Sequence, residues 1–436
     1  MQYIPQIIFT LILIAGVGYF ASNVKKLFRN IKLGKAIDVS DNKPQRWTNM
    51  AKIALGQTKM VVRPIAGFLH IIVYVGFIII NIEVLEIVID GIFGTHRIGL
   101  SVLNESVYGF LIGSFEILAV LVLIAVFAFW IRRNIIKIKR FLSSEMTGWP
   151  KNDGNIILYF EVVLMCLFLF MNATDTSFQN LDSGNVVSQF IAPFFDGMSE
   201  NSLHMMERTA WWLHIVGILV FLNYLYFSKH LHILLAFPNT YYGKLRPKGQ
   251  FLNNEAVTKE VKLMMDPSAD PFAAPAEDAP VPEKFGASDV TDLSWVQLLN
   301  AYTCTECGRC TSECPANLTG KKLSPRKIMM DTRDRLVEVG KNIDANKGTF
   351  VPDGKQLLGD YITNEELWAC TSCNACVEAC PVSIDPLSII MDMRQYLVME
   401  QSAAPSDLNN MMGNIENNGA PWPFNQQDRL NWANES

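Results

Sequence analysis

The chain has 436 residues, half of which are hydrophobic, and its formal net charge at pH 7 is −5. This length allows two or three domains, and the sequence has no concentrated basic run of the kind that nucleic-acid-binding proteins use. Long apolar runs fill residues 1–240, whereas the remainder has the composition of a soluble protein, so the two halves require separate interpretations.

Five apolar stretches in the first half are long enough to cross a bilayer as helices, which takes about 20 residues each. They cover residues 3–22, 64–89, 107–130, 155–172 and 210–227. No positive residue precedes the first stretch and no small-residue cleavage site follows it, so we expect a membrane helix there and not a signal peptide.

The positive charges predict the orientation of these spans. Lysine and arginine follow the first, third and fifth spans, whereas the loops at 90–106 and 173–209 are poor in them. Since loops on the cytoplasmic side carry the excess of positive charge, the N-terminus is expected outside and everything after the fifth span inside. The chain is therefore predicted to be a multi-pass protein of the cell inner (cytoplasmic) membrane, held in the lipid bilayer.

Four of the six histidines lie in or beside the spans: His70, His214, His230 and His232. Ionisable residues at membrane depth usually have a function, although a single histidine can also form a hydrogen bond between helices. His214 and His232 are 18 residues apart, which is about five helical turns or about 27 Å along one face. A neighbouring second span could offer His70 to the same iron, so the pattern indicates b-type haem.

These features resemble the nitrate reductase gamma subunit and the membrane subunit of heterodisulfide reductase, over about residues 1–235. The resemblance implies two b haems between the second and fifth spans and electron exchange with a quinone. It implies that His70 and His214 ligate an outer haem and His232 an inner one. The family's other second-span histidine is Met60 here, which leaves open a Met60–His232 pair, a role for His230, or one haem. If the depths do not match, His70 would pair with His230 or His232 near the inner face.

Acidic residues also lie at membrane depth. Quinol oxidation releases two protons with two electrons, and a carboxyl group in apolar surroundings is suited to accept and pass on a proton. Glu83 and Glu116 are the candidates for this role. Glu86 can instead mark the headgroup boundary, and Glu161 lies nearer the inner end of the fourth span.

Residues 241–292 are predicted to be a connector. The segment 266–283 is rich in proline, alanine and acidic residues, and such a composition cannot bury a core, so we expect an extended tether there.

Eight cysteines form two runs of identical spacing, C-x2-C-x2-C-x3-C-P. This spacing binds [4Fe–4S] clusters, and in two-cluster ferredoxins the fourth cysteine of each run ligates the other cluster. Structural zinc prefers separated CxxC pairs, and disulfides require an oxidising compartment. The predicted ligands are Cys304, Cys307, Cys310 and Cys380 for one cluster, and Cys370, Cys373, Cys376 and Cys314 for the other.

Helices are expected from about residue 292, over 326–339 and over 386–400. With the stretches CGRC, LSPRK and WACTSCNAC, residues 293–400 resemble the α-helical ferredoxin domain of anaerobic glycerol-3-phosphate dehydrogenase and of heterodisulfide reductase. The predicted fold is all-α, with a five-helix transmembrane bundle (1–240), the connector (241–292), a cytosolic ferredoxin domain (293–400) and a polar tail (401–436).

In those relatives Cys-Cys-Gly domains follow the ferredoxin domain, whereas no cysteine follows Cys380 here. The resemblance implies that a separate cytosolic polypeptide carries them and that residues 401–436 dock it. The alternative is a tail without a role.

No nucleophile–base pair, phosphate loop or nicotinamide fingerprint stands out in the sequence. We therefore predict an electron-transfer subunit of a membrane-bound quinone oxidoreductase of the heterodisulfide reductase type. It would pass electrons between the (mena)quinone pool, b haem (one or two), two [4Fe–4S] clusters and a cytosolic partner protein or flavoprotein, in a direction that the sequence leaves open. The alternative is a membrane-anchored ferredoxin without haem, whose spans serve only as an anchor.

Overall fold

The computed structural model describes residues 3–247, 249–251, 253–268 and 284–434, and this part of the chain is all-α, as predicted. Five of its helices are long and apolar enough to cross a membrane, which confirms the five expected spans. They are α1 (Ile4–Ile31), α3 (Pro64–Phe93), α5 (Glu105–Asn134), α6 (Trp149–Thr174) and α8 (Glu200–Leu225).

Local sequence signals set the starts of these helices. Proline occupies the first turn of α1, α3 and α6, where its missing N–H group has no helical partner to lose. The Asn104 side chain accepts a hydrogen bond from the Val107 amide at the start of α5, at 2.8 Å, and Ser199 caps α8 in the same way through Ser202. Such caps satisfy backbone amides that a helix leaves free at its N-terminus.

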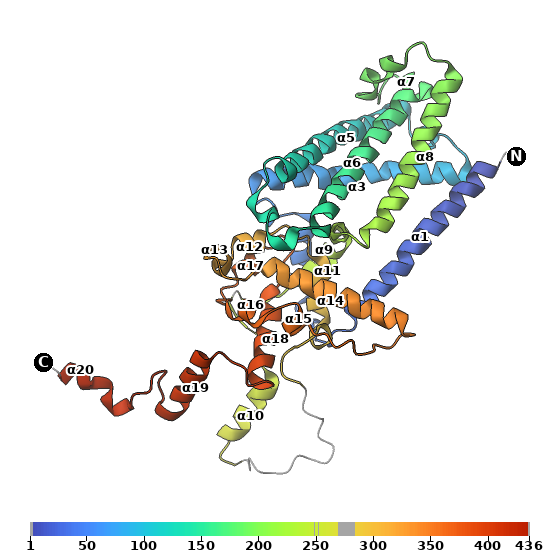
Figure 1. The fold of residues 1–436 in the computed structure, drawn as a ribbon. Coiled ribbons are helices and arrows are strands. Elements are labelled where there is room, and N and C mark those ends of the chain that lie inside the picture. The colour runs from blue at the N-terminus through green and yellow to red at the C-terminus, as the bar shows by residue number, and fades with distance from the viewer. Residues whose placement is uncertain (1–2, 248, 252, 269–283, 435–436) are drawn as a thin grey trace.

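The five helices form one bundle, drawn blue to green in Figure 1. Helix α6 packs between α5 and α8, α3 packs on α5, and α1 contacts α3 and α8. Phe115, Phe168 and Ile215 are fully or almost fully buried between helices, whereas Leu11 and Ile14 on α1 are more than 60% exposed. Exposed leucine and isoleucine in such numbers fit a surface that contacts lipid.

Short elements connect the long helices at the two ends of the bundle. We call the end that contacts the cysteine-rich domain the inner end, and the opposite end the outer end. The outer elements are α4 (Gly99–Val102), α7 (Thr176–Gln179), η4 (Ser188–Phe190) and η5 (Ala192–Phe195). The inner elements are α2 (Lys43–Met50), η1 (Ala51–Leu55), η2 (Lys139–Phe141), η3 (Ser144–Met146), η6 (Lys229–Leu231) and α9 (His232–Tyr241).

The fifth span ends close to the expected residue 227 and does not continue to His232. Helix α8 stops at Leu225, and the chain turns at Ser228 into η6 and α9. Asp153 on α6 stabilises this turn, since its buried carboxylate accepts hydrogen bonds from the Tyr224 and Ser228 hydroxyls at 2.5 and 2.7 Å and from the Lys229 amide at 3.1 Å. The prediction that His214 and His232 share one face of a single helix is therefore wrong.

The second half of the chain consists of short helices around two longer ones. The elements are α10 (Glu255–Met265), η7 (Val290–Asp292), α11 (Trp295–Thr303), α12 (Arg309–Ser312), α13 (Pro315–Leu318), α14 (Pro325–Ala345), α15 (Leu357–Asp360), α16 (Asn364–Trp368), α17 (Ala375–Ala379), α18 (Pro386–Met399), α19 (Ser406–Asn418), η8 (Gln426–Leu430) and α20 (Asn431–Asn434). Helices α11, α14 and α18 correspond to the three that we expected.

We call residues 284–400 the cysteine domain. Its packing starts before the expected boundary at 293, because Ala287 and Val290 are fully buried and Lys284 forms an ion pair with Asp292 at 2.6 Å. Most of the predicted tether, residues 269–283, lies outside the described residues.

The cysteine domain packs directly on the inner end of α1. The Lys35 amide donates to the Leu293 carbonyl at 2.8 Å, the Trp295 amide donates to the Lys35 carbonyl at 3.2 Å, and the Asn30 side chain donates to the Tyr302 hydroxyl at 2.9 Å. Figure 1 shows the orange and red helices of this domain directly below the bundle, with α19 and α20 extending away from both.

Candidate redox sites

The structure brings together the cysteines of the first predicted cluster. Cys304, Cys307 and Cys310 line one cavity with Cys380, the last cysteine of the second run. Cys304 and Cys380 are less than 10% exposed. Four sulfur atoms around one enclosed space form a donor set suited to an iron–sulfur cluster.

The other four cysteines of the two runs form a second group. Cys370 lies close enough to Cys314 and Cys373 for their charges to interact, and Cys376 interacts in the same way with Cys370 and Cys314. Cys373 is the exposed member of this group. Each group thus combines three cysteines of one run with the fourth of the other, which is the exchange that the predicted ligand sets require.

Burial affects the protonation of these thiols. It raises the pKa of Cys304 to about 12 and that of Cys380 to about 11. Buried thiols of this kind lose their protons when a metal ion supplies compensating positive charge, so both groups fit metal ligands better than free reactive cysteines.

The two runs follow the same backbone path with different residues. Glu306 and Ser372, which each precede the second cysteine, have φ angles of 53° and 58°. Gly308 and Asn374, which each follow it, have φ angles of 70° and 60°. This left-handed conformation favours glycine and asparagine.

Backbone amides also point at the sulfur atoms. The Ser372 amide donates to Cys370 Sγ at 3.4 Å, and the Ile384 amide donates to Cys380 Sγ at 3.3 Å. Hydrogen bonds to cluster sulfurs are one of the factors that set reduction potentials.

Glu306 connects the first run to the membrane bundle, and the sequence analysis missed it. Its side chain is 3% exposed and forms ion pairs with Lys229, just after α8, and with Arg333 on α14, the latter at 2.7 Å. Burial by itself would raise the pKa of Glu306, but Lys229 and Arg333 hold it below its ordinary value. Two features of the sequence could have indicated this ion pair: an acidic residue within a CxxC loop, and a lysine directly after a span.

The histidines form a group at the inner end of the bundle. The ring centres of His70 and His232 are 6.5 Å apart, with planes tilted by 37°, and the ring of His230 lies 5.5 Å from that of His232. Two imidazoles that ligate one metal from opposite sides have ring centres about 6 Å apart, since each metal–nitrogen bond is about 2 Å long. The spacing of His70 and His232 fits this arrangement.

The hydrogen bonding of His232 also suits a ligand. Its Nδ1 atom lies 3.0 Å from the Lys229 carbonyl, so Nδ1 carries the proton and Nε2 stays free, as is typical of metal-bound histidines. His70 Nδ1 is buried and has no hydrogen-bond partner among the residues that the structure describes.

The structure places His214 apart from this group. Its ring lies 6.3 Å from Phe168, and it lines a cavity of about 70 Å³ together with Phe77 and Asn81, which follow His70 on α3 by two to three turns. His70 lies near the inner end of α3 and His214 near the middle of α8, so the structure brings His70 next to His232 and not next to His214.

Met60 contacts Arg309 in the structure, whereas the sequence left open a pair of Met60 with His232. Arg309, within the first cysteine run, donates to Met60 Sδ at 3.0 Å and to the carbonyls of Lys59 and Met60. This contact holds the loop before α3 against the cysteine domain.

The two candidate carboxylates at membrane depth differ in their surroundings. Glu116 accepts hydrogen bonds from the amides of Val187 and Ser188, at 2.7 and 3.0 Å, and from the Asn172 side chain at 3.0 Å. Glu83 is equally buried, but its Oε2 atom has no partner among the described residues. Glu116 therefore anchors an outer loop, whereas Glu83 keeps an oxygen free.

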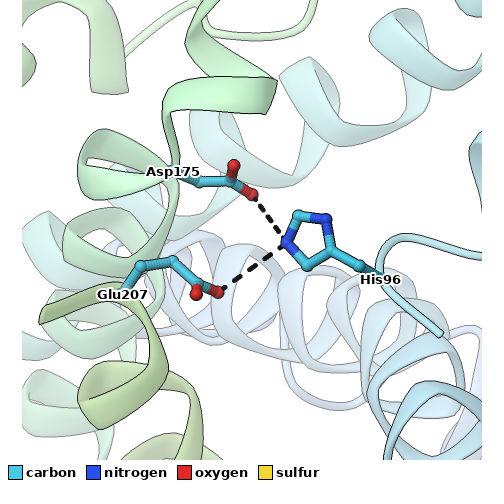
Figure 2. A group of neighbouring side chains, drawn as sticks. All are labelled: His96, Asp175 and Glu207. Atoms are coloured by element: carbon cyan, nitrogen blue, oxygen red, sulfur yellow. Dashed lines mark ion pairs between the residues drawn. The ribbon is translucent and has the colours of Figure 1, made fainter. Parts of the chain in front are cut away.

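A third group of polar side chains closes the outer end, as Figure 2 shows. His96 Nε2 lies 3.3 Å from Asp175 and 4.0 Å from Glu207. Asp175 also pairs with Arg97 at 2.7 Å, and Glu207 pairs with Arg208. Since both carboxylates have arginine partners, this group is an ion-pair network that ties α6, α8 and the loop after α3 together.

Residues 303–384, which include all eight cysteines of the two runs, match the family of 4Fe-4S dicluster domains. Over 99% of its length the chain is 29% identical to a probable iron-sulfur-binding oxidoreductase, FadF, of Bacillus subtilis, and over 91% it is 26% identical to the EtfAB:quinone oxidoreductase of Syntrophomonas wolfei. The chain spans 61% and 55% of these two relatives. A probable membrane-anchored ferredoxin of Chromohalobacter salexigens is 34% identical over 36% of the chain and 25% of that relative.

Components of the heterodisulfide reductases of Methanosarcina species are also similar, over shorter parts of the chain. No solved structure matches the chain. With the five apolar helices and the two groups of cysteines, these similarities make the chain a membrane-anchored iron–sulfur electron-transfer protein with a 4Fe-4S dicluster domain, homologous to a quinone oxidoreductase.

Proposed function

We propose that this protein transfers electrons between quinone in the bilayer and a protein partner in the cytoplasm, using b-type haem and two [4Fe–4S] clusters. The observation that supports this most is the connection between the histidine group and the first cysteine run. Lys229 holds His232 through its carbonyl and holds the Cys304–Cys307 loop through its ion pair with Glu306. One residue thus positions both candidate redox sites.

His70 and His232 are the proposed axial ligands of one haem. Their spacing and the protonated Nδ1 of His232 support this choice. A bound haem would supply a one-electron redox centre at the inner end of the bundle.

The two cysteine groups are the proposed cluster ligands, in the sets given above. The second group contains the exposed Cys373, so we propose that the partner docks near this residue. The name of the Syntrophomonas relative, EtfAB:quinone oxidoreductase, supports an electron-transferring flavoprotein as the partner. A protein with Cys-Cys-Gly domains is the other candidate, by resemblance to heterodisulfide reductase. The positive-inside rule supports a cytoplasmic cysteine domain.

The experiment is a reduced-minus-oxidised optical spectrum of the purified full chain, followed by reduction with a short-chain menaquinol analogue and, separately, with reduced electron-transferring flavoprotein. We expect a sharp b-haem band that His70→Ala or His232→Ala abolishes, while the iron content per chain stays close to that expected for two clusters. His204→Ala, on the exposed outer surface, serves as the control.

A protein that contains clusters but no haem band would support the alternative, a membrane-anchored ferredoxin, for which the Chromohalobacter relative is a precedent in name. A protein that neither a quinol reduces nor a quinone oxidises would contradict the proposed function altogether.

A further inference from the structure

We propose that the cavity lined by His214, Glu161 and Asn81 binds the headgroup of a quinol and accepts its protons. This inference rests on the proposed function and names the site where the bilayer substrate reacts. It gives His214 a role in substrate binding in place of haem ligation.

The cavity lies inside the bundle, where four membrane-spanning helices meet. It measures about 70 Å³ and opens between α3, α5, α6 and α8. Its wall is apolar except for three polar side chains, Asn81, Glu161 and His214, and the apolar part includes Phe77 and Ile218. A mostly apolar pocket with a few convergent polar groups is the usual form of a small-molecule site.

Two of the polar groups keep atoms without a partner, although His214 also forms a hydrogen bond with the Leu164 backbone. His214 is 2% exposed, and its Nδ1 atom has no hydrogen-bond partner among the described residues. Glu161 is 8% exposed, and the same part of the chain offers its carboxylate neither a hydrogen bond nor an ion pair. A buried polar group without a hydrogen bond costs free energy. A ligand with two hydroxyl groups would supply the hydrogen bonds that these two side chains lack.

The cavity also reaches the lipid-facing surface. Phe77 is 40% exposed and Asn81 is exposed, and both line the cavity. The Asn81 amide donates to the Phe77 carbonyl at 2.5 Å, which leaves its own oxygen available as an acceptor. A ligand can therefore enter sideways from the bilayer, as a quinol with an isoprenoid tail would. Because the cavity of about 70 Å³ is smaller than the roughly 150 Å³ of a cavity that holds benzene, its side chains must move apart to admit the ring.

The side chains of the cavity can accept both protons that quinol oxidation releases. When the quinol is oxidised, its two O–H bonds break, two electrons leave one at a time to the protein's one-electron centres, and the ring becomes a quinone. One proton passes to the Glu161 carboxylate and the other to the His214 imidazole. Both groups then release their protons to water before the next turnover.

The test uses the full chain in lipid vesicles, with Glu161→Gln and His214→Asn as variants and Glu200→Gln, which is exposed at the start of α8, as the matched control. We expect the rate of haem and cluster reduction by a menaquinol analogue to fall at least tenfold in both variants. The dithionite-reduced haem band should keep its full intensity, and the control should behave as the wild type does.

A binding measurement separates occupancy from turnover. We expect the fluorescent quinol analogue 2-heptyl-4-hydroxyquinoline N-oxide to bind wild-type vesicles with one site per chain, and at least tenfold more weakly when Ile218→Phe fills the cavity. Loss of haem in His214→Asn would overturn the proposal by making His214 a haem ligand. Unchanged quinol rates with unchanged haem would overturn it by placing the quinol elsewhere. Failure of the wild type itself to react with quinol would instead refute the proposed function on which it rests.

Discussion

Lys229 and Glu306 form an ion pair between the segment that follows α8 and the loop between Cys304 and Cys307. Both side chains are almost fully buried, and Arg333 pairs with the same carboxylate. A charge in this position both orients the loop and acts on any redox centre that the loop holds.

The first prediction concerns Glu306→Gln. Removing this negative charge should favour the more negative, reduced form of the cluster held by Cys304, Cys307 and Cys310, and so raise its potential by on the order of 50–100 mV. A redox titration followed by electron paramagnetic resonance measures the shift. Glu313→Gln removes an exposed partner of Arg63 in the same run and should change the potential far less. A lower potential in Glu306→Gln would contradict the prediction.

The same ion pair predicts a pH dependence. Because the pKa of Glu306 in the folded protein lies below its ordinary value, the ion pair contributes its full stabilisation above the unfolded pKa of about 4.3. That contribution is lost as the pH falls through the lower folded pKa. The wild type should therefore lose more thermal stability between pH 5 and roughly pH 3 than Glu306→Gln does. Parallel melting curves across this range would show that the pair contributes nothing.

A second substitution tests the turn after α8. In Asp153→Asn an amide NH2 group replaces one of the two oxygens that accept from Tyr224, Ser228 and Lys229. Losing a hydrogen bond to a buried charge costs about 1.5–3 kcal/mol, so the melting temperature should drop by several degrees. Asp196→Asn, in an exposed outer loop, is the control. If the turn holds His232 in place, the haem band should weaken in Asp153→Asn as well.

Contact between the two halves can be tested at a glycine. A Cβ atom at Gly340 on α14 would lie 2.5 Å from the Asn30 side chain, which is itself held by Tyr302. Gly340→Ala should therefore destabilise the chain by about 1–3 kcal/mol, despite the better helix propensity of alanine. Gly413→Ala is a matched helical control with open space around it, and it should be neutral or stabilising by up to about 1 kcal/mol. Equal melting temperatures for the two variants would argue against the observed docking.

The two carboxylates at membrane depth should respond differently to the same change. The Glu116 carboxylate accepts three hydrogen bonds, and Glu116→Gln replaces one of its two acceptor oxygens with an NH2 group. The substitution should therefore lower the free energy of unfolding by about 1–3 kcal/mol. Glu83→Gln should leave stability nearly unchanged, since one of its oxygens has no partner. It should slow quinol-driven reduction several-fold if Glu83 passes protons outward. Melting curves and stopped-flow reduction rates of both variants measure the difference, and a stable, slow Glu116→Gln protein would reverse the assignment.

The sequence predicted what depends on composition and spacing. The five spans follow from apolar length, and the cysteine spacing leads to the two groups around Cys304 and Cys370. What could not be predicted depends on contacts between distant residues. The 18-residue spacing of His214 and His232 fits one helical face, whereas the contacts of Asp153 stabilise a turn at Ser228 between them. That break removes His232 from the fifth span and places it beside His70.

The equivalence of the two cysteine loops has a further consequence for protein engineering. Glu306 and Ser372 have the same left-handed backbone conformation, so the requirement applies to the main chain and leaves each side chain open to a separate task. One loop uses this freedom to attach to the bundle, and the other does not. A chimaera with the Cys370–Cys376 heptapeptide grafted in place of Cys304–Cys310 should still assemble both metal centres, yet lose the contacts that Glu306 and Arg309 make with the membrane bundle.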